Sequence, residues 1–117
     1  MDATAATPTP AETHFARLSG LVPVAGRKVL DIGCGSGAFL KQLLAGGADA
    51  TGLEVTAATL ARAAAGGIDA ARLAPGDGRT LPFRAGSFAC ACFVFRCHRV
   101  PADLRVALTP PATPVIT

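Results

Sequence analysis

A glycine-rich segment that follows a short apolar run constrains the fold of this chain more than any other feature. The run is Lys28–Ile32, and Gly33, Gly35 and Gly37 come directly after it. Short apolar runs that stop at glycine are typical of strands buried on both faces of a parallel sheet. A turn this rich in glycine lets the backbone approach a ligand closely, and it directs the N–H groups of the next helix toward that ligand. The segment therefore predicts a strand, a ligand-binding turn and a helix, in that order.

The alternation of apolar strands and helices continues along the chain. Helical spacing predicts helices over 13–18, over 38–45 and from Thr56, as N-cap, to Ala65, with a further helix from Pro101. Strands are predicted near 48–53, 72–74, 88–94 and 115–116. This pattern predicts an α/β fold: a Rossmann-like, open and mostly parallel sheet of about five strands with helices on both faces.

The length of 117 residues suits one domain. Residues 1–11 are rich in Thr and Pro and are predicted to be disordered, so the domain is assigned to residues 12–117. The first residues lack the features of a secretory signal and no apolar run is long enough to span a membrane, so a cytoplasmic location is expected. The net charge of +3 is dispersed, which does not indicate a nucleic-acid partner.

The four cysteines do not form a pattern typical of disulfides or of zinc ligands. Cys34 lies in the glycine turn, and Cys90, Cys92 and Cys97 with His98 lack paired ligand spacing. We interpret them as reduced thiols, those of the later strand as core residues, and expect no metal.

Two carboxylates follow strands beside the glycine turn, and they help to choose its ligand. Gly33, Gly35 and Ala38 also fit the dinucleotide fingerprint, and Glu54 follows about 20 positions later, so spacing alone leaves the cofactor open. A carboxylate at Asp31 would repel a pyrophosphate, whereas it would attract the ammonium and sulfonium groups of S-adenosylmethionine. Glu54 could accept hydrogen bonds from ribose hydroxyls with either cofactor.

Three segments resemble the motifs of class I S-adenosylmethionine-dependent methyltransferases, of the small-molecule "methyltransferase type 11" kind. The sequence Val-Leu-Asp-Ile-Gly-Cys-Gly-Ser-Gly over 29–37 resembles the family's first motif. Residues 51–54 are similar to its second-strand motif, and residues 76–83, Gly-Asp-Gly-Arg-Thr-Leu-Pro-Phe, resemble its "GDA-x-x-LPF" segment. The three segments occur in the family's order over about residues 28–100.

The resemblance implies a set of cofactor-binding residues. Residues of the glycine turn would hold the methionine end, Glu54 the ribose, and Val55 would lie beside the adenine. Residues after the third strand would bind the adenine amino edge, and the end of the fourth strand would face cofactor and substrate. The implied set is Asp31, Gly33, Cys34, Gly35, Gly37, Glu54, Val55, Asp77, Gly78 and Phe93. His98 matches a frequent histidine position of the family and is the candidate general base.

The chain also departs from the family's pattern. Ala89 stands where aspartate is usual, and Pro111-Ala112 stands where a "PGG" turn is usual. The sequence stops before the family's last antiparallel strands, which implies a truncated or degenerate member. Those strands normally cover the edge of the fifth strand, so an exposed edge there predicts a homodimer or poor solubility.

The resemblance implies transfer of a methyl group from S-adenosylmethionine to a small-molecule acceptor. A non-catalytic cofactor-binding or interaction module is an alternative, because of the missing strands and Ala89. An NAD-dependent oxidoreductase is a second alternative, which the glycine spacing allows and Asp31 argues against. The binding roles of single residues also have purely structural alternatives. Residues 33–37 could form a tight turn without a ligand, and Glu54 and Asp77 could be solvated turn residues or helix caps.

Overall fold

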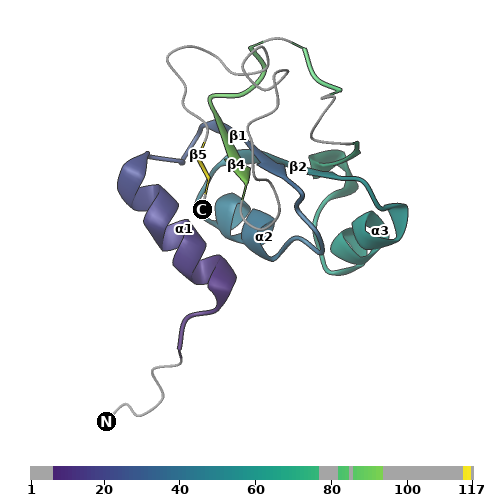
Figure 1. The fold of residues 1–117 in the computed structure, drawn as a ribbon, viewed down its shortest axis with the longest axis horizontal. Helices are drawn as coiled ribbons and strands as arrows, with labels where there is room; N and C mark the ends of the chain where they lie inside the picture. The colour runs from purple at the N-terminus through teal and green to yellow at the C-terminus, as the bar shows by residue number, and fades with distance from the viewer. Residues whose placement is uncertain (1–6, 77–81, 85, 94–114, 117) are drawn as a thin grey trace.

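The computed structural model of the chain describes residues 7–76, 82–84, 86–93 and 115–116. In that part, strands and helices alternate around one parallel sheet (Figure 1). The elements are α1 (Pro10–Leu21), β1 (Lys28–Ile32), α2 (Ala38–Ala45), β2 (Asp49–Glu54), α3 (Ala57–Ala65), the 3-10 turn η1 (Ala70–Arg72), β3 (Leu73–Pro75), β4 (Cys90–Phe93) and β5 (Val115–Ile116).

The five strands lie in the order β3-β2-β1-β4-β5. The chain therefore moves outward from β1 to β3 and then returns to the other side of β1 with β4. In register, Asp31 of β1 lies between Gly52 of β2 and Cys92 of β4. Such a reversal beside the central strand is where open α/β sheets bind ligands, at the carboxyl ends of the strands. The predicted fold class is confirmed.

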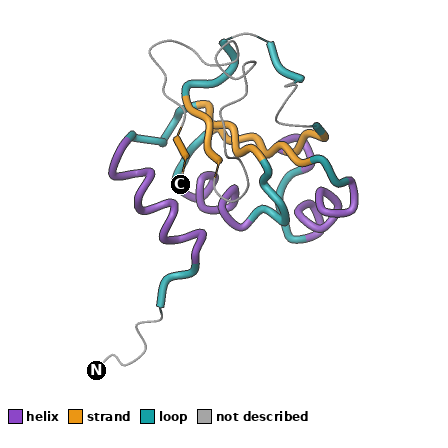
Figure 2. Tube along the Cα trace, in the orientation of Figure 1, coloured by secondary structure: helices purple, strands orange, loops and turns teal. Residues whose placement is uncertain are grey.

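The three helices pack on one face of the sheet, as Figure 2 shows. Side chains alternate along the strands, so Val29, Ala50, Cys90 and Cys92 point toward this face. Their partners in the core come from all three helices and are almost fully buried: Ala11, Leu18, Phe39, Leu40, Leu43 and Ala63. This packing holds the helix that follows the glycine turn firmly against the sheet.

The opposite face of the sheet forms a second apolar cluster. Leu30, Ile32, Leu53 and Ala91 are buried there together with Phe88. Phe83 packs edge-on against Phe88, with ring centroids 4.9 Å apart and an interplanar angle of 84°. The helix predicted from Pro101, which would cover this face, lies outside the described residues.

The first helix begins earlier than the sequence analysis predicts. It starts at Pro10 instead of Thr13, so residues 10 and 11, predicted to be disordered, belong to α1. The Thr9 hydroxyl accepts a hydrogen bond from the Glu12 N–H (3.1 Å), and the Glu12 carboxylate accepts one from the Thr9 N–H (2.8 Å). This capping box, with proline at the first helical position, offsets the low helix propensity of the segment. None of the described helices is long and apolar enough to cross a bilayer.

Most other boundaries agree closely with the sequence. The first strand and the helices ending at Ala45 and Ala65 are confirmed at the predicted residues, and Val115–Ile116 is a strand. The third strand lies one residue later than predicted. The fourth strand begins at Cys90, two residues after the predicted start, although Phe88 is buried as a strand residue would be.

Candidate functional site

The glycine turn after β1 leaves its backbone open on one side. Gly33, Gly35 and Gly37 have φ values of 73°, 58° and 93°, which residues other than glycine rarely adopt. A Cβ atom added at Gly33 or Gly35 would meet no atom of the described residues within 4 Å. At Gly37 it would lie 2.1 Å from the Ile68 Cδ1 atom. The first two glycines therefore leave space above the turn, and the third permits close packing beneath it.

Hydrogen bonds join this turn to the end of β2. The N–H groups of Gly33 and Cys34 both donate to the Leu53 carbonyl, at 2.8 and 3.0 Å. The Cys34 side chain is buried beside Gly52, where an added Cβ would lie 2.7 Å from the Cys34 Sγ atom. Burial, with the negative charges of Asp31 and Glu54, raises the pKa of the Cys34 thiol to about 12. Cys34 thus anchors the turn as a neutral core side chain.

Asp31 is a buried acid beneath the glycine turn. Its side chain is only 1% exposed, and its Oδ2 atom has no hydrogen-bond partner among the residues that the structure describes. Burial, and secondly the nearby charge of Glu54, raises its pKa to about 8. A buried carboxyl without a partner is costly, and a cationic ligand group would supply the missing partner.

This burial changes the charge argument made from the sequence. The sequence predicts a carboxylate that repels a pyrophosphate and attracts a cation. With a pKa near 8, the group is mainly neutral at pH 7 until a cation binds. Its preference for a cation over an anion therefore rests on the orphaned buried oxygen and not on a standing negative charge.

Glu54 occupies the end of β2 and faces the same turn. One of its carboxylate oxygens accepts a hydrogen bond from the Gly35 N–H (3.1 Å) and the other accepts one from the Thr56 N–H (3.2 Å). The structure thus brings Asp31, Glu54 and the glycine turn together, as predicted from the order of the strands. Thr56 is the N-cap of α3 as predicted, although its hydroxyl makes no capping hydrogen bond.

Among the described residues, Val55 is one of two large apolar side chains that are exposed, with 66% of its surface accessible. It directly follows Glu54, so an apolar surface adjoins a carboxylate at the mouth of the site. A flat aromatic base could cover this side chain while Glu54 binds a neighbouring hydroxyl. That combination fits the adenine and ribose positions that the resemblance implies.

Several predicted residues remain untested by the structure. Asp77, Gly78 and His98 lie outside the described residues. Phe93 is the last residue of β4, opposite Ile32 and Ile116 in register, and its side chain is not described. The predicted adenine-edge and general-base roles therefore stay predictions.

The buried thiols of β4 point to the helical face. Cys90 and Cys92 are free, and a hydrogen bond between them lowers the pKa of Cys90 and raises that of Cys92. Among the described residues no group of three or more metal-ligating side chains occurs. Cys97 lies outside that part of the chain.

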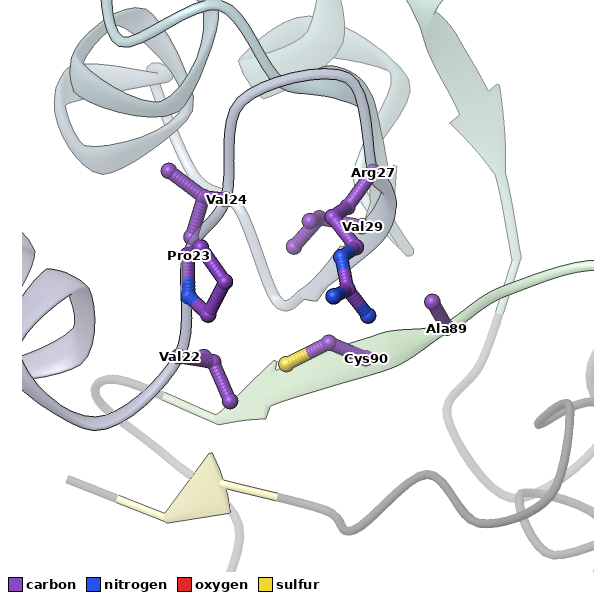
Figure 3. A pocket seen from close by; sticks show the side chains of 7 residues that line it. All are labelled: Val22, Pro23, Val24, Arg27, Val29, Ala89 and Cys90. Atoms are coloured by element: carbon purple, nitrogen blue, oxygen red, sulfur yellow. The ribbon is translucent and has the colours of Figure 1, made fainter.

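A small pocket lies at the other end of the sheet. Figure 3 shows its lining side chains, which surround a volume of about 30 Å³ beside the starts of β1 and β4: Val22, Pro23, Val24, Arg27, Val29, Ala89 and Cys90. The glycine turn follows the opposite end of β1. This pocket is far too small for a nucleoside and is separate from the candidate site.

Solved structures share this fold. An S-adenosylmethionine-dependent methyltransferase from Mesorhizobium loti is 27% identical, with a TM-score of 0.76 over 92% of this chain and 53% of its own. A Pyrococcus horikoshii protein is 23% identical, with a TM-score of 0.78 over 90% of this chain and 54% of its own. A SAM-dependent methyltransferase from Aquifex aeolicus is 16% identical, with a TM-score of 0.69 over 86% of this chain and 61% of its own.

These comparisons also show how much of a relative the chain represents. It spans little more than half the length of the Mesorhizobium and Pyrococcus structures. The comparison with curated proteins gives no match. The sequence model of the methyltransferase domain family matches residues 29–110, which is more than half of the chain and includes the glycine turn and the ends of β1 and β2. The chain therefore belongs to the methyltransferase domain family.

Proposed function

We propose that this chain binds S-adenosylmethionine at the carboxyl ends of β1 and β2 and supports methyl transfer to a small-molecule acceptor. The observation that carries the proposal is the buried, partnerless Asp31 carboxyl beneath an open glycine turn. A group that is both cationic and attached to a nucleoside would give this carboxyl a partner of opposite charge when it ionises, which the phosphates of a dinucleotide cannot do.

Each described residue has a separate task in this proposal. Gly33 and Gly35 leave room for the methionine end, and Asp31 lies ready to pair with its ammonium group. Glu54 accepts hydrogen bonds from the ribose hydroxyls, and Val55 covers one face of the adenine. When bound, the cofactor supplies a methyl group already activated on a sulfonium. The chain therefore has mainly to position the two reactants and exclude water.

Titration calorimetry with S-adenosylmethionine and with S-adenosylhomocysteine tests the binding step. The wild-type chain is expected to bind both, and Asp31→Ala and Glu54→Ala are each expected to weaken binding at least about tenfold, since each removes a charged hydrogen-bond partner. Asp49→Ala is the matched control, because Asp49 lies at the opposite end of β2. A folded wild-type chain that binds neither compound would contradict the proposal.

A non-catalytic cofactor-binding module is a second candidate. Its support is that the chain spans only 53% and 54% of the length of two similar structures. A methyl-transfer assay against a panel of small amines, thiols and phenols separates the candidates. Labelled methyl on any acceptor establishes the enzyme, whereas cofactor binding without transfer to any acceptor favours the module.

Self-association through a sheet edge is a further part of the proposal. In the described part of the chain β5 pairs only with β4, so it forms one edge of the sheet. Exposed edge strands pair readily with another copy. Sedimentation velocity over a concentration series is expected to show a dimer, and a monomer at every concentration would refute self-association.

A further inference from the structure

The surroundings of Asp31 have a consequence for how the site takes up its ligand. Its side chain points to the helical face of the sheet, between Gly52 and Cys92 in register, and is 1% exposed. Glycine on one side and a thiol on the other supply no cation. The buried residues of α2 on this face are Phe39, Leu40 and Leu43, which are apolar.

Among the described residues, the titratable groups that act on Asp31 oppose its ionisation or are neutral. Glu54 of β2 acts on it with like charge, and burial acts in the same direction. Cys34 of the turn and Cys92 of β4 also interact with it, and the pKa of each of these thiols is raised, so both stay neutral at pH 7. A charged carboxylate here would be buried without any compensating partner in the described part of the chain, so the protonated form is the stable one.

We propose that Asp31 is a neutral carboxylic acid in the empty site and that it releases one proton to solvent when a ligand brings an ammonium group to its Oδ2 atom. The O–H bond of the carboxyl breaks, the proton goes to water, and the carboxylate pairs with the ligand cation, so charge balances. This inference rests on the proposed function, and it goes further by coupling the binding of the ligand's amino-acid end to the release of one proton from Asp31. Ligands without that end bind without proton release.

Proton release makes binding depend on pH in a defined direction. Below the pKa of Asp31, which is about 8, each unit of rising pH increases the affinity for an ammonium-bearing ligand about tenfold. An α-amino group has an ordinary pKa of about 8 and stays almost fully protonated below about pH 6.5, so the range from about pH 5 to 6.5 isolates the contribution of Asp31. A nucleoside that lacks the amino group has no such dependence.

Calorimetry with two related probes, S-adenosylhomocysteine and 5′-methylthioadenosine, tests the inference. Both carry the adenine and ribose, and only the first carries the amino-acid end. In buffers of different ionisation enthalpy at pH 6.5, S-adenosylhomocysteine is expected to release about one proton and 5′-methylthioadenosine none. In Asp31→Asn, which cannot ionise, the release and the pH dependence are expected to vanish, while 5′-methylthioadenosine binds as in wild type and so reports an intact site.

A measurement on the chain without ligand tests the protonation state of Asp31 independently of whether the proposed cofactor binds. Carbon-13 NMR of the Asp31 carboxyl, assigned by comparison with Asp31→Asn, is expected to show a neutral acid at pH 7. Titration at the ordinary aspartate range would overturn the inference even if both probes bind. Equal proton release by both probes, or by neither, would overturn it and leave the nucleoside site standing. Failure of both probes to bind would refute the proposed function and this inference together.

Discussion

The turns after β1 and β2 lie side by side and prepare for a ligand in different ways. The turn after β1 presents backbone, because Gly33, Gly35 and Gly37 have positive φ values and the first two leave open space. The turn after β2 contains no glycine and presents side chains, with Glu54 directed at the first turn and Val55 exposed. One turn therefore makes room, and the other supplies chemical groups.

The two acids at these strand ends, Asp31 and Glu54, also differ in their burial and in their hydrogen-bond donors. Glu54 is half-buried and accepts two backbone hydrogen bonds, so its charge is partly compensated before any ligand arrives. Asp31 is buried, and its Oδ2 atom has no partner in the described residues. Two acids in one site therefore meet different surroundings, because burial raises the pKa of Asp31 whereas Glu54 is half-buried and faces two backbone hydrogen-bond donors.

The largest expected effect is on the pH dependence of stability. The pKa of Asp31 is about 8 in the folded chain against an ordinary value of 3.8, so the folded state binds more protons between these pH values. Its favourable contribution is fully present below pH 4 and is lost as the pH rises toward 8, by up to about 1.4 kcal/mol per pH unit. Urea unfolding at pH 5 and pH 7 should show this loss in wild type, and Asp31→Asn should remove it. If the free energy of unfolding varies with pH in the same way in wild type and in Asp31→Asn, then Asp31 has an ordinary pKa in the folded chain.

The next largest effect is expected at Gly37, within the backbone-presenting turn. Gly37→Ala places a Cβ 2.1 Å from the Ile68 Cδ1 atom, at a φ of 93°. Backbone strain and displacement of Ile68 together should lower the free energy of unfolding by about 2–3 kcal/mol. Gly35→Ala is the matched control, since its Cβ meets no described residue within 4 Å and its φ of 58° is less strained. It should cost about 1 kcal/mol in stability. Equal losses in the two variants would mean that packing beneath the turn does not matter.

A third effect tests how the two turns are joined. In Gly52→Ala the new Cβ would lie 2.7 Å from the Cys34 Sγ atom and 2.8 Å from the Leu40 Cδ2 atom, so stability should fall by about 2 kcal/mol. In the Cys34→Ala background the same substitution should cost about 1 kcal/mol less, because the sulfur is gone. Thermal unfolding of the four chains of this cycle measures the coupling. Additive losses would place Cys34 and Gly52 out of contact.

Much of the glycine turn and its flanking elements could be predicted from sequence, because the residue patterns that specify them are local. The predicted boundaries of β1 and α2 match those of the structure, because the apolar run of β1 stops before a glycine and the helical pattern of α2 stops before Gly46. The meeting of Asp31 and Glu54 followed from strand order, because parallel strands bring their carboxyl ends to one edge.

Other features depend on contacts that no local pattern reports. The protonation state of Asp31 is set by burial and by cross-strand neighbours at Gly52 and Cys92, which are far away in sequence. The start of α1 is a different case, since Thr9 and Glu12 form a recognisable capping box. Composition alone favoured disorder there, and the spacing of these two residues was the signal that would have corrected it.

The smallest expected effect concerns the electrostatic interaction between Glu54 and Asp31. Glu54→Gln keeps one oxygen acceptor and replaces the other with an amide donor, so one of the hydrogen bonds from Gly35 or Thr56 is lost, at a cost of about 1 kcal/mol in stability. The substitution also removes the negative charge that helps to raise the pKa of Asp31, so the carbon-13 titration of Asp31 should move to lower pH. Asp49→Asn, at the opposite end of β2, removes an acid of equal charge and should leave that titration in place. If both variants move it equally, Asp31 senses the total charge of the chain and not Glu54 in particular; if neither does, burial alone keeps Asp31 protonated and the two strand ends act independently.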